Sequence, residues 1–299
     1  MSNKDSMKIG FVGFIYSPPP EIEDHIERIK WQTAKVHELG GSVFHLGGMP
    51  LLPDDWAKIE DLKGYIDSID VELEIGTPFV FGLTGDDKKQ FRADLLNQIK
   101  KAKKLGIKIM RAGYGKLKLP TSRFNKSYPL AEHKKFVIDN LIEAGKIFES
   151  EDIYFALENH CDFLAREFVE FFTAVNNKHV GCALDTANGY TVFDDANDEV
   201  EMLAPFAVTT HIKDMSIVEA DPQLGICPFV SVGCALGDGN VDIPRAIEVL
   251  DEKSPFSNGL HLIVEQGWFD LRGIEDPQAY QYACLEKSMI YLKELLGRK

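Results

Sequence analysis

Short runs of β-forming apolar residues alternate, eight times along the chain, with longer stretches that have the residue spacing of amphipathic helices. The strand-like runs are Lys8–Phe14, Ser42–Leu46, Val71–Ile75, Ile107–Arg111, Ile153–Glu158, Val180–Asp185, Ala207–Lys213 and Leu260–Gln266. The helix-like stretches are about Ile22–Leu39, a stretch from Asp54, Lys88–Leu105, Leu130–Ser150, Leu164–Val175, a short one near Val200–Ala204, Asp242–Leu250 and Gln278–Leu296. Eight such units predict an α/β fold, a single (β/α)8 TIM barrel that takes residues 1–299 as one domain.

A doubly wound open sheet is the competing arrangement for alternating strands and helices. That fold usually carries a glycine-rich turn directly after the first strand. Here the turn reads Gly10-Phe11-Val12-Gly13-Phe14-Ile15-Tyr16, which lacks the G-x-G-x-x-G spacing. The sequence therefore favours the barrel.

Composition and charge exclude several classes of protein. The formal charge of −14 repels polyanions, so nucleic acid is not an expected partner. No apolar run is long enough to cross a bilayer and the first six residues are polar, so we expect a cytoplasmic protein with no membrane partner. The five cysteines include no Cys-x-x-Cys pair and are expected to be reduced. A homo-oligomer is compatible with all of these features.

The last four strand-like runs each end in a side chain that can bind a metal ion: Glu158, Asp185, His211 and Glu265. Inside a parallel barrel, side chains point inward at every second residue and all strands end at the same face. This period turns the four side chains inward and Val208 outward. The residues expected one layer beneath them are small: Ala156, Ala183 and Thr209. The four side chains are therefore predicted to converge on one point.

Three carboxylates and one imidazole at one buried point would repel one another without a cation. A bound divalent ion explains the set better than four unrelated strand-end charges, although each residue alone could equally hydrogen-bond loop amides. Oxygen-rich ligation with one histidine suits Mn²⁺, with Mg²⁺, Co²⁺, Fe²⁺ or Zn²⁺ as alternatives. Such a site leaves coordination positions for a substrate.

The order Glu158, Asp185, His211 and Glu265 on strands five to eight resembles the xylose-isomerase-like TIM-barrel superfamily. The segment Gly237-Asp238-Gly239-Asn240-Val241-Asp242 is similar to the G-x-G-x-[VI]-D turn of that superfamily. The resemblance implies a metal-dependent sugar or sugar-phosphate isomerase or epimerase with a small sugar or sugar derivative as substrate. It further implies that Glu158 and Glu265 remove and return a proton next to a carbonyl, while Asp185 and His211 only bind the metal.

Two positions depart from the pattern of ketose 3-epimerases. Some of these enzymes have a histidine where this chain has Asn188, and an arginine where it has Ile217. The sequence thus looks more like the broad sugar phosphate isomerase/epimerase branch, which leaves a lyase, a dehydratase or a C-glycoside-cleaving subunit as alternatives. An endonuclease-IV-like DNA repair enzyme fits less well, because Asn188 replaces a histidine and no Asp-x-His is present. A non-catalytic subunit is the third alternative.

Six further residues are expected to line the substrate pocket because they lie at or just beyond strand ends. They are His45, Arg111, His160, Asn188, Lys213 and Trp268. His160 and Lys213 could instead be exposed loop residues, His45 and Arg111 could serve packing or ion pairing, and Trp268 could be an interfacial aromatic. Two loops are also longer than a connection requires. The basic loop Gly113–Pro129 could cover the pocket, or contact solvent or another subunit, and Met215–Leu236 is expected to form a hairpin lid.

Overall fold

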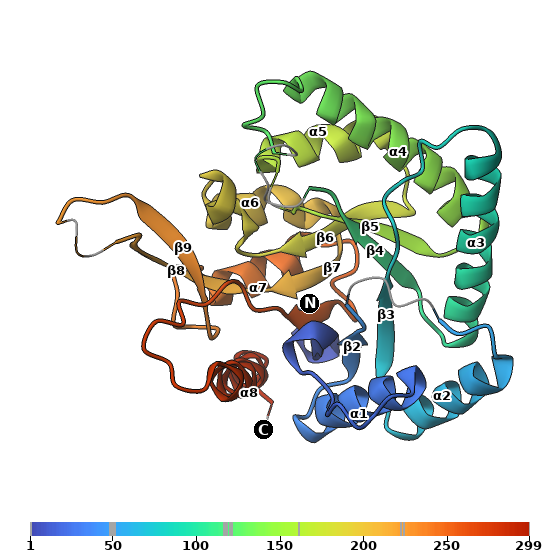
Figure 1. Ribbon diagram of the computed structural model, residues 1–299, viewed down its shortest axis with the longest axis horizontal. Helices are drawn as coiled ribbons and strands as arrows, with labels where there is room; N and C mark the ends of the chain where they lie inside the picture. Colours follow the sequence, from blue (N-terminus) through green and yellow to red (C-terminus); the bar gives the residue numbers. More distant parts are fainter. Residues whose placement is uncertain are drawn as a thin grey trace.

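The strands of the protein form a closed, eight-stranded parallel barrel (Figure 1). The structure is a computed structural model, and it describes residues 2–47, 52–115, 119, 122–160, 162–221, 223 and 225–298. The barrel strands are β1 (Lys8–Val12), β2 (Val43–His45), β3 (Glu72–Gly76), β4 (Ile109–Gly113), β5 (Tyr154–Glu158), β6 (Val180–Asp185), β7 (Ala207–Ile212) and β10 (His261–Val264). They are hydrogen-bonded in the order β1-β10-β7-β6-β5-β4-β3-β2. The predicted (β/α)8 barrel is confirmed.

Helices surround the barrel and follow its strands along the chain. They are α1 (His25–Glu38), α2 (Trp56–Ser68), α3 (Gly85–Lys104), α4 (Leu130–Ser150), α5 (Ala165–Val175), α6 (Ala196–Leu203), α7 (Ile243–Lys253) and α8 (Pro277–Leu295). The short helix expected near residues 200–204 begins earlier, at Ala196, because the carboxylate of Asp195 accepts a hydrogen bond from the backbone N–H of Asn197. No helix in the described ranges is both long and apolar enough to span a membrane.

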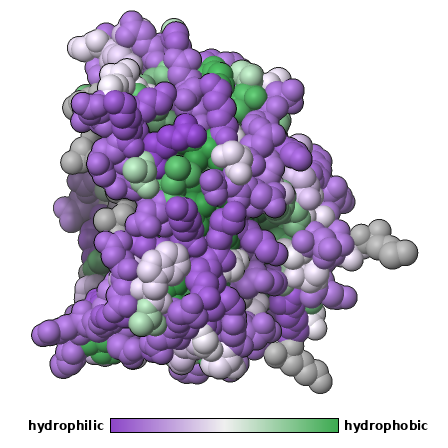
Figure 2. Space-filling view, turned by 90° about the vertical axis from the view of Figure 1, so that its right-hand side faces the viewer, coloured by the Kyte–Doolittle hydropathy of each residue, from purple (hydrophilic) through white to green (hydrophobic). Residues whose placement is uncertain are grey.

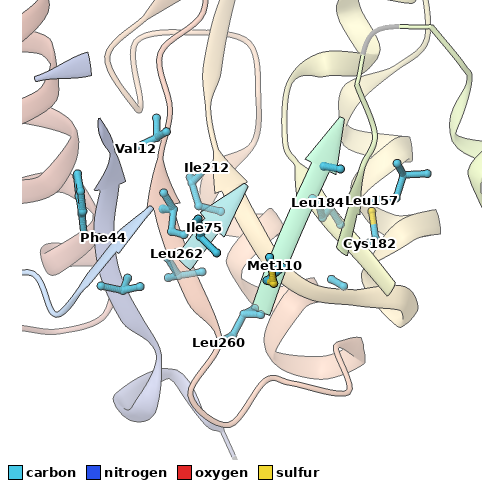
Figure 3. Close-up of a cluster of buried hydrophobic side chains, with 14 of the residues drawn as sticks. Val12, Phe44, Ile75, Met110, Leu157, Cys182, Leu184, Ile212, Leu260 and Leu262 are labelled. Atoms are coloured by element: carbon cyan, nitrogen blue, oxygen red, sulfur yellow. The ribbon is translucent and has the colours of Figure 1, made fainter. Parts of the chain in front are cut away.

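The main core lies between the strands and the helices. Figure 3 shows part of this layer, where Leu157 of β5 lies beside Cys182 and Leu184 of β6. All three side chains are fully buried. By contrast, the outer face shown in Figure 2 is mainly hydrophilic, as expected for a strongly charged chain. The burial of one face of every strand fixes the barrel register, because a slip by one residue would exchange the two faces.

A second, smaller cluster fills part of the barrel interior. It contains Ile109, Ala156, Ala183 and Val208. The prediction that Val208 points outward is therefore wrong. The pairing of β6 with β7 shifts between Cys182 and Ala183, so β7 carries one extra residue there. Such a β-bulge reverses the alternation on one side of the extra residue, which turns Val208 inward while His211 keeps its expected direction.

The turn before α7 is held by one buried carboxylate, that of Asp214. It accepts hydrogen bonds of 2.8–3.1 Å from the backbone N–H groups of Met215, Gly237, Gly239 and Val241. A Cβ atom at Gly239 would lie 2.1 Å from Oδ1 of Asp214, so this turn needs glycine there. The glycine-rich segment noted in the sequence thus forms a compact turn at the carboxyl end of the barrel.

The loop between β7 and α7 contains the expected hairpin, made of β8 (Asp214–Glu219) and β9 (Phe229–Cys234). It extends away from the barrel in Figure 1 instead of folding across it. In the loop Gly113–Pro129, Lys116 and Lys118 lie outside the described residues. Arg123 of that loop forms an ion pair of 2.5 Å with Glu167 in the first turn of α5, so this cation binds the protein itself.

Candidate metal centre

The four predicted metal ligands lie together at the carboxyl end of the barrel. Each of Glu158, Asp185, His211 and Glu265 offers one ligand atom, and these four atoms lie within 4.8 Å of one another. The first three residues belong to β5, β6 and β7, and Glu265 directly follows β10. The convergence follows from the barrel, because neighbouring parallel strands bring their ends to one face.

Two side chains fix the relative positions of these strand ends. The amide of Asn159, after β5, bonds both backbone groups of Asp185: Oδ1 accepts from its N–H at 2.7 Å and Nδ2 donates to its carbonyl at 2.8 Å. The hydroxyl of Thr186, after β6, similarly accepts from the N–H of Lys213 at 2.8 Å and donates to its carbonyl at 2.6 Å. Both pairs of bonds are buried, so they hold the ligands in a defined geometry.

The contacts of the ligand atoms fit a cation better than they fit one another. Oδ2 of Asp185, Nδ1 of His211 and Oε2 of Glu265 are buried and have no well-formed hydrogen bond to any residue within the described ranges, although Oδ2 of Asp185 forms an ion pair with Lys213. Nδ1 of His211 lies 2.7 Å from Oε2 of Glu265 and 3.7 Å from Oε1 of Glu158. Carboxylate oxygens with one imidazole nitrogen are ligands that divalent ions such as Mn²⁺ and Mg²⁺ accept. These four residues could therefore hold a divalent ion.

The protonation equilibria of these groups reflect crowded negative charge. Burial raises the pKa of Asp185 above its ordinary value, and the carboxylates of Glu265 and Glu158 add to the shift, although Lys213 opposes it. Burial and Arg111 would lower the pKa of His211, but the same two glutamates outweigh them and raise it. Both shifts mean that the centre attracts positive charge, which a dication would supply.

Lys213 and Asn188, both expected to touch substrate, also lie directly against the ligands. Nζ of Lys213 is 2.8 Å from Oδ2 of Asp185 and donates a hydrogen bond of 2.7 Å to Oδ1 of Asn188. Nδ2 of Asn188 donates at 3.3 Å to Oε1 of Glu158. Asn188 thus bridges the ammonium group of Lys213 and the carboxylate of Glu158, at the position where a histidine stands in some 3-epimerases.

His45 of β2 and Arg111 of β4 reach the centre from strands that carry none of the four ligands, and β4 pairs directly with β5. Nδ1 of His45 lies 3.1 Å from Nε2 of His211. The guanidinium of Arg111 is 3.7 Å from Oε2 of Glu158, and only 2% of the residue is exposed. His45 is the last residue of β2, as the sequence predicted. The prediction that Arg111 ends its strand is wrong, because β4 runs from Ile109 to Gly113 and Arg111 is the third of its five residues.

Glu74 of β3 is a buried part of this region that the sequence analysis missed. It is fully buried, accepts hydrogen bonds from Nδ1 of His261 at 2.6 Å and from the hydroxyl of Thr209 at 2.5 Å, and lies 3.5 Å from Arg111. Despite burial, His261 and Arg111 lower the pKa of Glu74 to about 2. The signal was present: in Val71–Ile75, Glu72 and Glu74 alternate with apolar residues, which places both carboxylates on one face of the strand.

Two cavities border the metal centre. The larger, of about 570 Å³, is lined by six predicted residues: His45, Arg111, Glu158, His160, His211 and Glu265. Aromatic residues that the sequence did not single out, among them Phe14, Phe79 and Tyr114, also line it. The smaller, of about 270 Å³, is lined by Asn188, Lys213 and Trp268. His160 and Glu265 line both cavities. Within the described part of the chain, no residue of the hairpin β8–β9 lines either one, so the expected lid is not placed over them.

The chain matches a known protein family over most of its length. The family model described as "Xylose isomerase-like TIM barrel" matches residues 33–284. A curated relative, 3-oxo-isoapionate decarboxylase from Pectobacterium atrosepticum, is 24% identical over 212 residues. That alignment covers 70% of this chain and 66% of the relative. The chain thus spans slightly less than two thirds of the length of that decarboxylase.

Several solved structures share the whole fold. A xylose isomerase-like TIM barrel protein from Mycobacterium smegmatis, in complex with magnesium, superposes with a TM-score of 0.71 at 18% identity, covering 99% of this chain and 98% of that one. D-psicose 3-epimerase from Clostridium cellulolyticum H10, with D-tagatose, gives 0.70 at 16% identity, covering 97% and 99%. 3-keto-D-glucoside 4-epimerase from E. coli gives 0.64 at 18% identity, covering 96% and 99%. At these identities the likeness concerns the fold.

Proposed function

Because this chain belongs to the xylose isomerase-like TIM barrel family, we propose that it is a divalent-metal-dependent enzyme that isomerises or epimerises a sugar or a sugar derivative. One observation carries the proposal: four ligand atoms from four strand ends lie within 4.8 Å of one another beside a cavity of about 570 Å³. A buried concentration of carboxylates costs free energy unless a cation is bound there. The structural similarity to a magnesium complex and to two sugar epimerases supports the same reading.

Glu158, Asp185, His211 and Glu265 would hold the ion, with Mn²⁺ as the first choice for this donor set. When bound, such an ion acts as a Lewis acid that polarises a substrate carbonyl and stabilises the negative charge that develops on its oxygen. Asp185 is held for this role by the two backbone bonds from Asn159, and His211 by its contact with His45.

The two glutamates are proposed to move the proton. Both line the larger cavity, and both lie near Nδ1 of His211, at 3.7 Å for Glu158 and 2.7 Å for Glu265. One carboxylate would remove a proton from the carbon next to the carbonyl, and the other would return a proton to the same or the neighbouring carbon. Positioned general bases of this kind contribute about 10²- to 10⁴-fold to a rate. His160, at the boundary of the two cavities, is proposed to contact substrate hydroxyls.

A decarboxylase or another lyase is the second candidate, because the curated relative at 24% identity is 3-oxo-isoapionate decarboxylase. In that reaction a carbon–carbon bond breaks in place of a carbon–hydrogen bond, and its electron pair moves toward a neighbouring carbonyl oxygen. Carbon dioxide leaves, and Glu158 or Glu265 supplies the proton that completes the product. The same centre therefore serves both reactions, and the substrate decides between them.

The test uses metal-loaded protein in D2O with a panel of ketoses and 3-oxo sugar acids. NMR measures deuterium incorporation at carbon, and carbon dioxide release is followed separately. We expect Glu158→Gln and Glu265→Gln each to lose turnover by about 10²- to 10⁴-fold, and Glu219→Gln, an exposed carboxylate on β8, to keep it. Full activity of either site variant would remove that glutamate from proton transfer. Failure to bind any divalent ion would refute the metal-dependent reaction as a whole.

A further inference from the structure

We propose that the larger cavity binds a carboxylate group of the substrate through Arg111, so that the natural substrates are sugar acids and not neutral ketoses. The proposal deepens the proposed function and rests on it, because the cavity is the one beside the proposed metal centre. It starts from buried hydrogen-bonding groups on two residues that line this cavity, groups that have no hydrogen-bond partner among the residues that the structure describes.

Arg111 is the first of these groups. The residue is 2% exposed and lines the cavity, yet Nε and NH2 make no hydrogen bond to any residue of the described segments. NH1 makes one long bond, 3.4 Å to the carbonyl of Thr210. The carboxylates of Glu74 and Glu158 are 3.5 and 3.7 Å away, beyond ordinary hydrogen-bond distance. A guanidinium has five N–H groups, and leaving them unbonded when buried is costly, which indicates a ligand with strong acceptors.

His45 adds a second donor. Nδ1 of His211 faces Glu265 and Glu158, so its other nitrogen, Nε2, carries the hydrogen in the metal-binding form and donates to Nδ1 of His45 at 3.1 Å. This hydrogen-bond network assigns a hydrogen to Nε2 of His45. That nitrogen is buried and has no partner among residues that the structure describes. His45 lines the same cavity as Arg111 and therefore adds a second N–H donor without a partner in the described part of the chain.

These groups call for a ligand with two acceptors and no donor, which is a carboxylate. Its two oxygens match the parallel N–H groups of a guanidinium, and charge-assisted pairs of this kind are stronger than neutral hydrogen bonds. A phosphate fits less well, because Glu74 and Glu158 already flank Arg111 and would repel a doubly charged phosphate more strongly than a singly charged carboxylate. The cavity, at about 570 Å³, accommodates a polyhydroxy acid beside Phe14 and Phe79, whose rings can face its carbon chain.

The test measures binding of inert probes to the Mn²⁺-loaded protein by calorimetry. The probes are D-gluconate, the neutral D-glucitol and D-glucitol 6-phosphate. A charged, two-point hydrogen bond should make D-gluconate bind about 10- to 100-fold more tightly than D-glucitol. Arg111→Lys keeps the charge but not the fork, so it should lose most of this preference while D-glucitol binding stays the same. Arg245→Gln, an exposed arginine of α7, should keep the preference.

Three results would overturn the carboxylate site: equal binding of D-gluconate and D-glucitol, tighter binding of the phosphate, or a preference that survives in Arg111→Lys. The last result would mean that the carboxylate binds only the ion. Arg111→Gln provides a second variant, and Mn²⁺ titration of each variant reports whether the metal centre is intact. If the protein binds no Mn²⁺, the proposed function fails, and the same comparison in the presence of a chelator still decides whether Arg111 selects a carboxylate.

Discussion

Replacing Glu74 by glutamine should destabilise the folded barrel, because the Glu74 carboxylate neutralises the positive charges of two buried side chains, His261 and Arg111. It lies 2.6 Å from Nδ1 of His261 and 3.5 Å from Arg111 and has no exposed surface. The pKa of Glu74 is lowered from 4.5 to about 2. At about 1.4 kcal/mol for each tenfold change in an equilibrium constant, this interval corresponds to about 3 kcal/mol in favour of the charged form.

An independent comparison gives a similar size. Removing one partner of a buried ion pair typically costs about 3–5 kcal/mol. We expect the lower end for Glu74→Gln, since Glu72 and Glu158 still face the two cations at 3.1 and 3.7 Å. Urea-induced unfolding followed by circular dichroism measures the change in the free energy of unfolding. The exposed control Glu219→Gln should stay within about 0.5 kcal/mol of the original protein.

The pH dependence provides a second measurement of the same pair. The stability from Glu74, whose pKa is depressed, is present above about pH 4.5 and is lost as pH falls through about 2. For His261 the pKa is raised from 6.5 to about 9 by Glu72 and Glu74 against the effect of burial, so its contribution is complete below about 6.5 and is lost as pH rises through about 9. Glu74→Gln should flatten the alkaline loss. If its stability and pH profile match those of the original protein, the interior charges do not stabilise the barrel.

Three further changes test other parts of the structure. Asn159→Ala removes both bonds to the backbone of Asp185 and should weaken Mn²⁺ binding in calorimetry by about 10- to 100-fold, whereas unchanged affinity would exclude a positioning role. Gly239→Ala should lower the free energy of unfolding in urea by about 1–3 kcal/mol, because its Cβ would lie 2.1 Å from Asp214. The control Gly64→Ala in α2 meets nothing within 4 Å and should raise that free energy by about 0.5–1 kcal/mol. The reverse order of stability would refute the contact at Gly239. Chelation of the metal should lower the melting temperature of the protein. Mn²⁺ at about 100 times its dissociation constant should then raise the free energy of unfolding by about 2.7 kcal/mol. An unchanged melting temperature in both experiments would refute a bound ion.

The convergence of the candidate ligands could be predicted because it depends on local pattern alone. A strand that ends in Glu158 or Asp185 presents that side chain at the same face as every other parallel strand. The glycine-rich turn was recognisable for a similar reason, since its glycines and the cap residue Asp242 lie close together in the chain. Features of this kind depend only on residues that are close together in the chain, so the sequence is sufficient to predict them.

The contacts across the barrel interior could not be predicted in the same way. Glu74 meets His261, which lies 187 residues further along the chain, and Thr209, 135 residues further along. Which strands face each other across the interior depends on closure and stagger of the whole sheet. The inward turn of Val208 also depends on a shift in strand pairing. The alternation around Glu74 places its side chain on one face of the strand, but neither its partners nor the pairing shift beside Val208 can be predicted from the residues nearby.

The sequence by itself determined the barrel, the strand ends and the identity of four side chains that could bind a metal, because periodic burial and strand direction are encoded residue by residue. Only the tertiary structure decided which polar atoms remain unpaired when the barrel closes. It turned Lys213 and Asn188 toward the ligands and left Arg111, which lines a cavity, with two nitrogens that make no hydrogen bond within the described ranges. Pairing of polar groups is a property of the closed interior, since each buried donor depends on acceptors contributed by distant strands.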